Sequence, residues 1–221
     1  MDEKRKACIH DIDLDGTSFI APVEGSHGVW YYGMDPSSGD LYEAEEILKD
    51  GIIPKGDRLF LIRYPEGTVS AVHERKDGVC HEVPVYDHGK ICVLCVDFLS
   101  HSIHISEIDP ETITERETAV IPLDSVRDCY NLKLLRTPLC LCRSGKEDLF
   151  EMIWPEHVSF RVSPHESLSL RIGERVYFTE WFEDPDYREE TVIRDIHTGE
   201  ILERLHGDIR LMPDGSYWHV H

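Results

Sequence analysis

The chain has 221 residues, of which 41% are hydrophobic and 30% charged, a balance typical of a globular protein and too apolar for a disordered one. Its 43 acidic side chains against 23 basic ones give a formal charge of −20. Nucleic acids and anionic membrane leaflets attract basic surfaces, so neither is an expected partner. The acidic excess is interpreted as a solubility surface, with a site for cations or basic partners as the alternative.

No targeting or membrane-spanning segment is visible. Residues 1–8 have no apolar stretch behind their basic residues, and the longest apolar run, Ile91 to Val96, is far shorter than the roughly 20 residues that span a bilayer. Seven cysteines at irregular spacing in a chain of this size indicate reduced thiols. We therefore expect a cytoplasmic protein.

The first motif along the chain is acidic, with Asp11, Asp13 and Asp15 before Gly16. Alternating carboxylates before a glycine are typical of the first half of a calcium loop. The later ligand positions hold Phe19 and Pro22 instead of acids, so the stretch is interpreted as a solvated acidic turn and no cofactor is expected. Weak calcium binding by Asp11, Asp13 and Asp15 is the alternative.

The same stretch, Asp13-Leu-Asp15-Gly-Thr17, also resembles the first motif of haloacid dehalogenase-like phosphatases. The resemblance implies Asp13 as nucleophile and Asp15 as general acid. That fold requires alternating strands and helices, which the rest of the chain lacks.

Period-two alternation dominates the chain beyond this acidic motif. Residues 58–64 and 90–98 are apolar on both faces, as interior strands are, whereas residues 157–163 and 167–172 each have one polar face. Short turns containing glycine separate such runs. Residues 40–50 fit a helix with Asp40 as N-cap, but they also fit a strand.

Cysteine and histidine patterns predict no metal site. Cys92 and Cys95 have the spacing of a zinc or redox pair, but residues three apart on a strand point to opposite faces, so both are interpreted as buried hydrophobes. The 13 histidines, including the pairs His101/His104 and His219/His221, are interpreted as scattered surface residues.

The strand pattern predicts the fold class. Five hairpins are expected, at residues 29–42, around Gly78, at 103–113, around Gly145 and at 191–202. In 221 residues they average about 44 residues each, close to the blade length of a β-propeller. Residues 195–200 (Asp-Ile-His-Thr-Gly-Glu) resemble the turn before the outermost strand of a propeller blade, and residues 210–218 resemble the segment that opens the next blade. The prediction is a single all-β domain over residues 1–221, an antiparallel meander forming a small propeller of about five blades. Another β-sandwich or barrel is the alternative.

The candidate ligand site is a loop that combines aromatic rings with carboxylates. It lies within residues 177–190, and its candidate ligand-binding residues are Glu180, Trp181, Glu183, Asp184 and Asp186. Such a combination suits sugars or cationic ligands. Because neighbouring strand residues face opposite sides, one of Trp181 and Phe182 is expected in the interior.

The sequence bounds the function without naming a ligand. The expected function is a binding or interaction module of propeller type, with a protein or a small molecule as ligand. The alternative is a carbohydrate-active enzyme that uses two carboxylates of the acidic loop. No catalytic residue is assigned.

Overall fold

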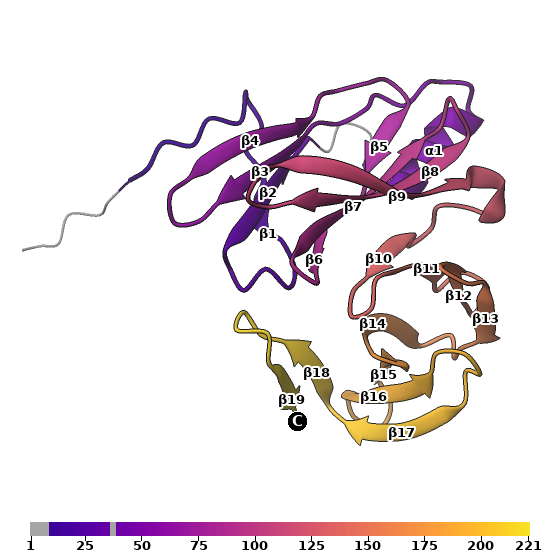
Figure 1. Cartoon of the computed structure of the whole chain (residues 1–221). Helices are drawn as coiled ribbons and strands as arrows, with labels where there is room; N and C mark the ends of the chain where they lie inside the picture. Colours follow the sequence, from indigo (N-terminus) through magenta and orange to yellow (C-terminus); the bar gives the residue numbers. More distant parts are fainter. Residues whose placement is uncertain (1–8, 36–38) are drawn as a thin grey trace, which may run out of the picture.

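The computed structural model describes residues 9–35 and 39–221. Four antiparallel sheets follow one another along the chain and are arranged in a ring, as the blades of a β-propeller are (Figure 1). Within each sheet, neighbouring strands are also neighbours in sequence or nearly so. This meander results from the short turns between alternating runs, since a tight turn leaves the next strand beside the last one.

The blades are numbered in chain order, and all four contain four or five strands. Blade 1 consists of β1 (Ile20–Pro22), β2 (Trp30–Met34), β3 (Leu59–Arg63) and β4 (Thr68–His73). Blade 2 consists of β5 (Val79–His81), β6 (Val85–Asp87), β7 (Lys90–Asp97), β8 (Ser102–Asp109) and β9 (Thr114–Pro122). Blade 3 consists of β10 (Lys133–Leu135), β11 (Cys140–Ser144), β12 (Leu149–Trp154) and β13 (Val158–Arg161). Blade 4 consists of β14 (Glu166–Ile172), β15 (Arg175–Phe182), β16 (Arg188–Asp195) and β17 (Ile201–His206).

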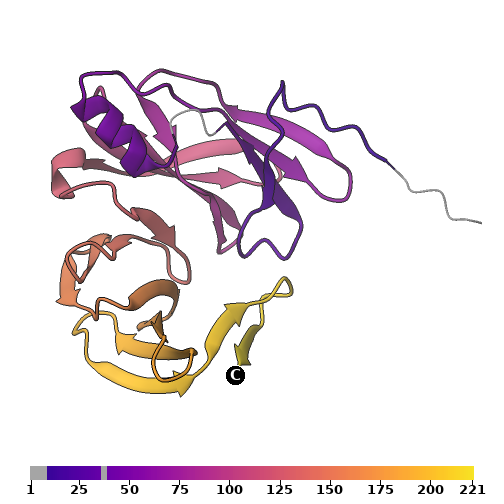
Figure 2. The same cartoon turned by 180° about the vertical axis from the view of Figure 1, so that it is seen from behind.

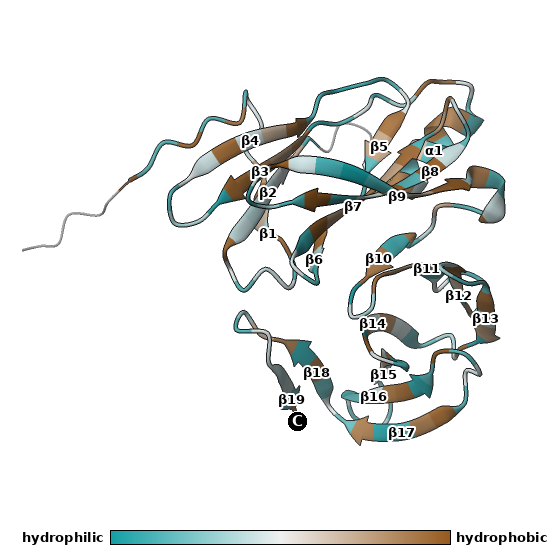
Figure 3. Cartoon of the chain, in the orientation of Figure 1, coloured by the Kyte–Doolittle hydropathy of each residue, from teal (hydrophilic) through white to brown (hydrophobic). Residues whose placement is uncertain are grey.

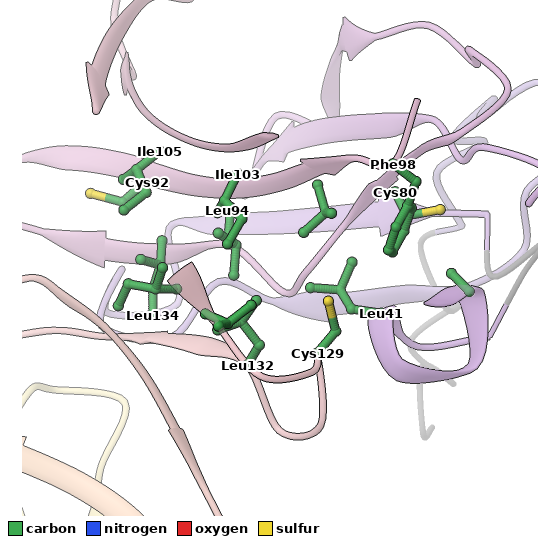
Figure 4. Close-up of a cluster of buried hydrophobic side chains, with 14 of the residues drawn as sticks. Leu41, Cys80, Cys92, Leu94, Phe98, Ile103, Ile105, Cys129, Leu132 and Leu134 are labelled. Atoms are coloured by element: carbon green, nitrogen blue, oxygen red, sulfur yellow. The ribbon is translucent and has the colours of Figure 1, made fainter. Parts of the chain in front are cut away.

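The hydrophobic core lies between successive blades. One cluster joins blades 1 and 2 and includes Leu61 and Val93. A second joins blades 2 and 3 (Figure 4). A third joins blades 3 and 4 and includes Phe150 and Phe178. The central strands β3 and β7 are therefore apolar on both faces, as predicted, and are almost wholly buried. The edge strand β13 alternates between half-buried and exposed residues, whereas the edge strand β17 is mostly exposed and mixes apolar with polar residues (Figure 3).

Residues 40–50 form a helix, which settles the alternatives left open by the sequence. Helix α1 (Leu41–Lys49) begins after Asp40, whose carboxylate accepts a hydrogen bond from the backbone N–H of Glu43 at 2.8 Å. Leu41 and Ala44 are buried in the cluster between blades 2 and 3. Their burial there explains why helix wins over strand at this position. A short 3₁₀ helix, η1 (Leu123–Ser125), comes after β9.

A two-stranded hairpin closes the ring. Strands β18 (Asp208–Leu211) and β19 (Tyr217–Val220) pair only with each other in the described part of the chain. They lie between blade 4 and blade 1, with the hairpin tip directed at blade 1 (Figures 1 and 2). A Cβ atom on Gly215 would lie only 2.4 Å from His27 Cε1, so the tip contacts the loop between β1 and β2.

The predicted small, antiparallel propeller is confirmed, with four blades and this hairpin in place of about five blades. Two of the five hairpins expected from the sequence do not form. The first, at 29–42, is replaced because β2 is followed along the chain by α1, with residues 36–38 of its turn outside the described part, and the turn at Gly78 joins strands of different sheets. The propeller-like segment at 195–200 does precede the last strand of blade 4. The segment at 210–218 lies in the closing hairpin.

None of the helices in residues 9–35 and 39–221 has the length and apolar character needed to cross a bilayer.

Candidate functional site

The predicted acidic loop lies at one end of blade 4, and its five candidate residues do not converge. Residues 183–187 connect β15 to β16 and are all exposed. Glu180 is instead buried, with its carboxylate 2.6 Å from Arg204. Burial raises the pKa of Glu180, but the hydrogen bonds from Arg204 and Ser163 and the charge of Arg204 together outweigh it and hold this pKa below the ordinary value. Trp181, the next residue on β15, lies on the opposite face.

The expectation that Trp181 or Phe182 lies in the interior was wrong. Trp181 is 40% exposed. Among the described aromatic residues it contacts only His165, in a T-shaped arrangement with the two ring centres 5.3 Å apart. Phe182 is half-buried beneath the guanidinium of Arg188, which lies 4.1 Å from the ring centre. Both rings stand at the end of β15, beyond the cluster that joins blades 3 and 4. The role of the loop residues in ligand binding stays a prediction.

The acidic motif near the N-terminus is exposed and partly occupied by protein groups. The carboxylate of Asp13 accepts a hydrogen bond from the backbone N–H of Asp15 at 2.9 Å. Asp15 in turn forms an ion pair with Arg58. A calcium ion bound by Asp11, Asp13 and Asp15 would compete with that guanidinium. Calcium binding here stays a prediction.

A group of titratable side chains lies between blades 1 and 2, around a cavity of about 420 Å³. The register of blade 2 places His81, Cys95 and His104 in one row across β5, β7 and β8. The next row contains Ser106 and Glu117. These residues share the face of blade 2 that meets blade 1, because Val93 of the core cluster lies two residues from Cys95. The lining residues are His73, Lys76, Val79, Cys95, Asp97, His104, Ser106, Glu115 and Glu117.

A chain of hydrogen bonds, here called the imidazole chain, runs from the interior to this cavity through Asp57, His81, His73, Glu115 and Ser106. Its inner end is Asp57, which accepts from the ring Nδ1 and, at 3.0 Å, from the backbone N–H of His81. His81 Nε2 lies 2.7 Å from His73 Nδ1, and His73 Nε2 lies 2.9 Å from Glu115 Oε2. Ser106 donates to the other oxygen of Glu115. The chain links both blades, since His73 belongs to β4 of blade 1.

The hydrogen bonds along the chain satisfy both of its carboxyl groups. Asp57 accepts from the ring and from the backbone N–H of His81, and the two oxygens of Glu115 accept from His73 and from Ser106. In keeping with this, the hydrogen bond from His73 holds the pKa of Glu115 below its ordinary value.

The groups around the cavity favour binding over nucleophilic chemistry. Burial raises the pKa of the Cys95 thiol above its ordinary value, which keeps it protonated and unreactive. Ser106 has only Glu115 as hydrogen-bonded base, and a carboxylate of lowered pKa is a poor base for a hydroxyl. No group of three or more His, Cys, Asp or Glu side chains in residues 9–35 and 39–221 is arranged to hold a metal ion.

Sequence reasoning missed this cavity. It treated the histidines as scattered surface residues, yet the His81 side chain is only 2% exposed. One signal was present: His104 and Ser106, and likewise Glu115 and Glu117, are two residues apart and share a face of a strand. Nothing in the sequence, however, places β4 of blade 1 against that face. The expectation that Cys92 and Cys95 point to opposite faces is confirmed, since Cys92 packs toward blade 3.

No protein-family model matches the chain, and no curated protein matches it. Among solved structures, it is similar to a chain in the crystal structure of the mitotic checkpoint complex, at 11% identity and a TM-score of 0.45. That match covers 93% of this chain, which spans 60% of the other. It is also similar to a protein of Bacteroides uniformis described as a 6-phosphogluconolactonase, at 8% identity and a TM-score of 0.30, covering 93% of this chain and 78% of that one. The propeller arrangement therefore rests on the sheets of this chain itself.

Proposed function

We propose that the chain is an interaction module of propeller type, which binds a cationic group of its partner, an amine or guanidinium, in the cavity between blades 1 and 2. One observation carries the proposal: three carboxylates, those of Asp97, Glu115 and Glu117, line a cavity in which the only lysine or arginine among the lining residues is Lys76.

The local charge balance supports a cationic ligand. Lys76 is paired with Asp97 at 3.0 Å, and His73 and His81 are hydrogen-bonded to Glu115 and Asp57. Burial raises the pKa of Asp97, but the backbone N–H of Ser100 and the ammonium group of Lys76 more than offset it, so this carboxyl stays ionised. Glu117 contacts His104 at 3.0 Å and keeps an exposed carboxylate. The net charge of −20 adds attraction for a cation at longer range.

The test is calorimetric titration of the full chain with acetyl-arginine amide, with acetyl-citrulline amide as the uncharged analogue. The arginine probe is expected to bind and the citrulline probe is not. Glu117→Gln should weaken binding about two- to fivefold, which is the effect of one exposed ion pair. Lys76→Met should strengthen it, because it removes the competing cation.

Glu203→Gln is the matched control. Glu203 is an exposed carboxylate on β17 of blade 4, so this variant changes the net charge by the same amount but away from the cavity. Binding should be unchanged. Equal weakening by both glutamine variants would mean that the probe senses only the overall charge, and the proposal would then be wrong.

A further inference from the structure

A second cavity, of about 330 Å³, lies between blades 3 and 4. Lys133 of β10 pairs with Cys142 of β11, and Ser144 pairs with Phe150 of β12. Cys142 and Phe150 belong to the cluster that joins blades 3 and 4. Residues directly opposite each other on a sheet share a face, so Lys133 and Ser144 both project toward blade 4. The other side of the cavity is formed by the start of β14, at Glu166, Ser167 and Leu168.

The Ser144 hydroxyl lacks a hydrogen bond. Ser144 is only 4% exposed, and no hydrogen-bond partner for its Oγ lies within the described part of the chain. Its backbone carbonyl is occupied, since it accepts from Asn131 Nδ2 at 3.0 Å. Buried hydroxyl groups are normally paired, because an unpaired one loses its hydration without compensation. A buried donor at the edge of a polar cavity therefore points to a molecule that completes the bond.

The charge in this cavity is positive, unlike that of the molecule as a whole. Lys133 Nζ donates one hydrogen bond, to the Leu168 carbonyl at 3.2 Å, and an ammonium group has three hydrogens to donate. The carboxylate of Glu166 does not neutralise it, because both of its oxygens are held by Arg194 at 2.7 and 2.9 Å. Lys133 thus contributes a cation without an ion-pair partner among the described residues.

We propose that this cavity is a binding site for a small organic anion, whose carboxylate or phosphate oxygens accept hydrogen bonds from Lys133 Nζ and Ser144 Oγ. A volume of 330 Å³ equals the space of about ten water molecules in the liquid, so the ligand has on the order of ten non-hydrogen atoms. The site is independent of the proposed cation-binding cavity. It lies between different blades and selects the opposite charge.

The test is calorimetric titration of the full chain with citrate and, separately, with inorganic phosphate. Binding of either anion is expected, and whichever binds more tightly identifies the anionic group. Ser144→Ala should weaken binding about fivefold, the effect of one hydrogen bond. Lys133→Met, which keeps the aliphatic stem, should weaken it about tenfold or more. Lys90→Met is the matched control, because it also removes one lysine charge but does so in blade 2, where Lys90 pairs with Asp109. This variant should leave anion binding unchanged.

The melting temperature of the ligand-free protein gives a second readout. Removing an unpaired hydroxyl should leave the melting temperature of Ser144→Ala equal to or above that of the parent chain. A clear fall would show that Ser144 is already paired inside the fold, and would overturn the premise. Absence of heat with both anions, or binding that neither cavity variant weakens, would overturn the site itself.

Discussion

At the scale of single residues, Asp35 is a carboxylate held by three hydrogen-bond donors. Its carboxylate accepts hydrogen bonds from Arg58, from Thr17 and from Arg75. The hydrogen bond from Arg58, the largest effect, helps to lower the pKa of Asp35 from 3.8 to about 2. Asp15 also binds Arg58, so the same guanidinium joins the N-terminal segment to blade 1.

This environment predicts a pH-dependent contribution to stability. A carboxyl whose pKa is lower in the folded state stabilises the fold above its unfolded pKa, and the effect is lost as the pH falls through its folded pKa. Asp35→Asn should therefore lower the free energy of unfolding by about 1–2 kcal/mol at pH 7, and the difference should shrink below about pH 4 and vanish only below about pH 2. Urea denaturation at several pH values measures it. Asp124→Asn, at an exposed carboxylate on η1, is the control. A loss that did not change with pH would contradict the assignment.

Trp181 and Phe182 give a second prediction at this scale. Because neither ring belongs to a core cluster, Trp181→Ala and Phe182→Ala should each lower the free energy of unfolding by about 1 kcal/mol or less. Phe178, four residues before Phe182 on the same strand, is fully buried, and Phe178→Ala should cost about 3–5 kcal/mol. Thermal melting separates the two outcomes. A collapse of the fold in Trp181→Ala would show that the acidic loop is part of the core after all.

At the scale of elements, the imidazole chain connects β4, β5, β8 and β9, and it also holds the segment before β3 through Asp57. Its members bond in series, so each side chain is paired only as long as its neighbours remain. Such a series should behave as one unit in mutagenesis.

The prediction is non-additivity. His81→Leu leaves the buried carboxyl of Asp57 without its hydrogen-bond partner and should cost about 3–5 kcal/mol, and Asp57→Leu should have a similar effect. The double variant should cost clearly less than the sum of the two, because it leaves no unpaired charge at that position. Chemical denaturation of the four proteins measures the coupling. Additive losses would mean that the two groups do not act as a pair.

At the scale of the whole molecule, the ring is closed by contact and not by a shared sheet. The hairpin of β18 and β19 pairs with no other strand of the described chain, and its tip reaches blade 1 at His27. Gly215 makes this approach possible, because it has a φ of +83° and no Cβ.

Gly215→Ala should therefore weaken the closure. Gly173 provides a matched control, since it also has a positive φ, of +60°, but has open space around it. Both variants introduce backbone strain of about 1 kcal/mol, and only Gly215→Ala also clashes with the His27 ring, so that this ring or the tip must move. We expect it to be the less stable of the two, with faster hydrogen exchange in β18 and β19. Equal stability and exchange would show that tip contact does not hold the ring.

How well the sequence predicts the structure of this protein differs from one element to the next. Alternation identified β3, β7, β13 and β14 and the last hairpin of blade 4, because strand burial depends directly on a period of two. The sequence could not decide between helix and strand for residues 40–50, whose apolar positions suit both. The number of hairpins was overestimated because a glycine turn has the same sequence pattern in two situations. After Gly145 the next strand joins the same sheet, whereas after Gly78 it joins a different one.

By itself, then, the sequence determined the all-β class, the antiparallel meander and the acidic surface, because these depend on local periodicity, turn chemistry and composition. Only the tertiary structure decided the candidate sites. His73 lies eight residues from His81 and 42 from Glu115, and Ser144 lies 22 residues before Glu166 across the second cavity. Their proximity comes from the packing of one blade face on the next, which a single strand's pattern does not encode. A blade face can be recognised from its own residues, but its neighbour can be recognised only in the folded ring.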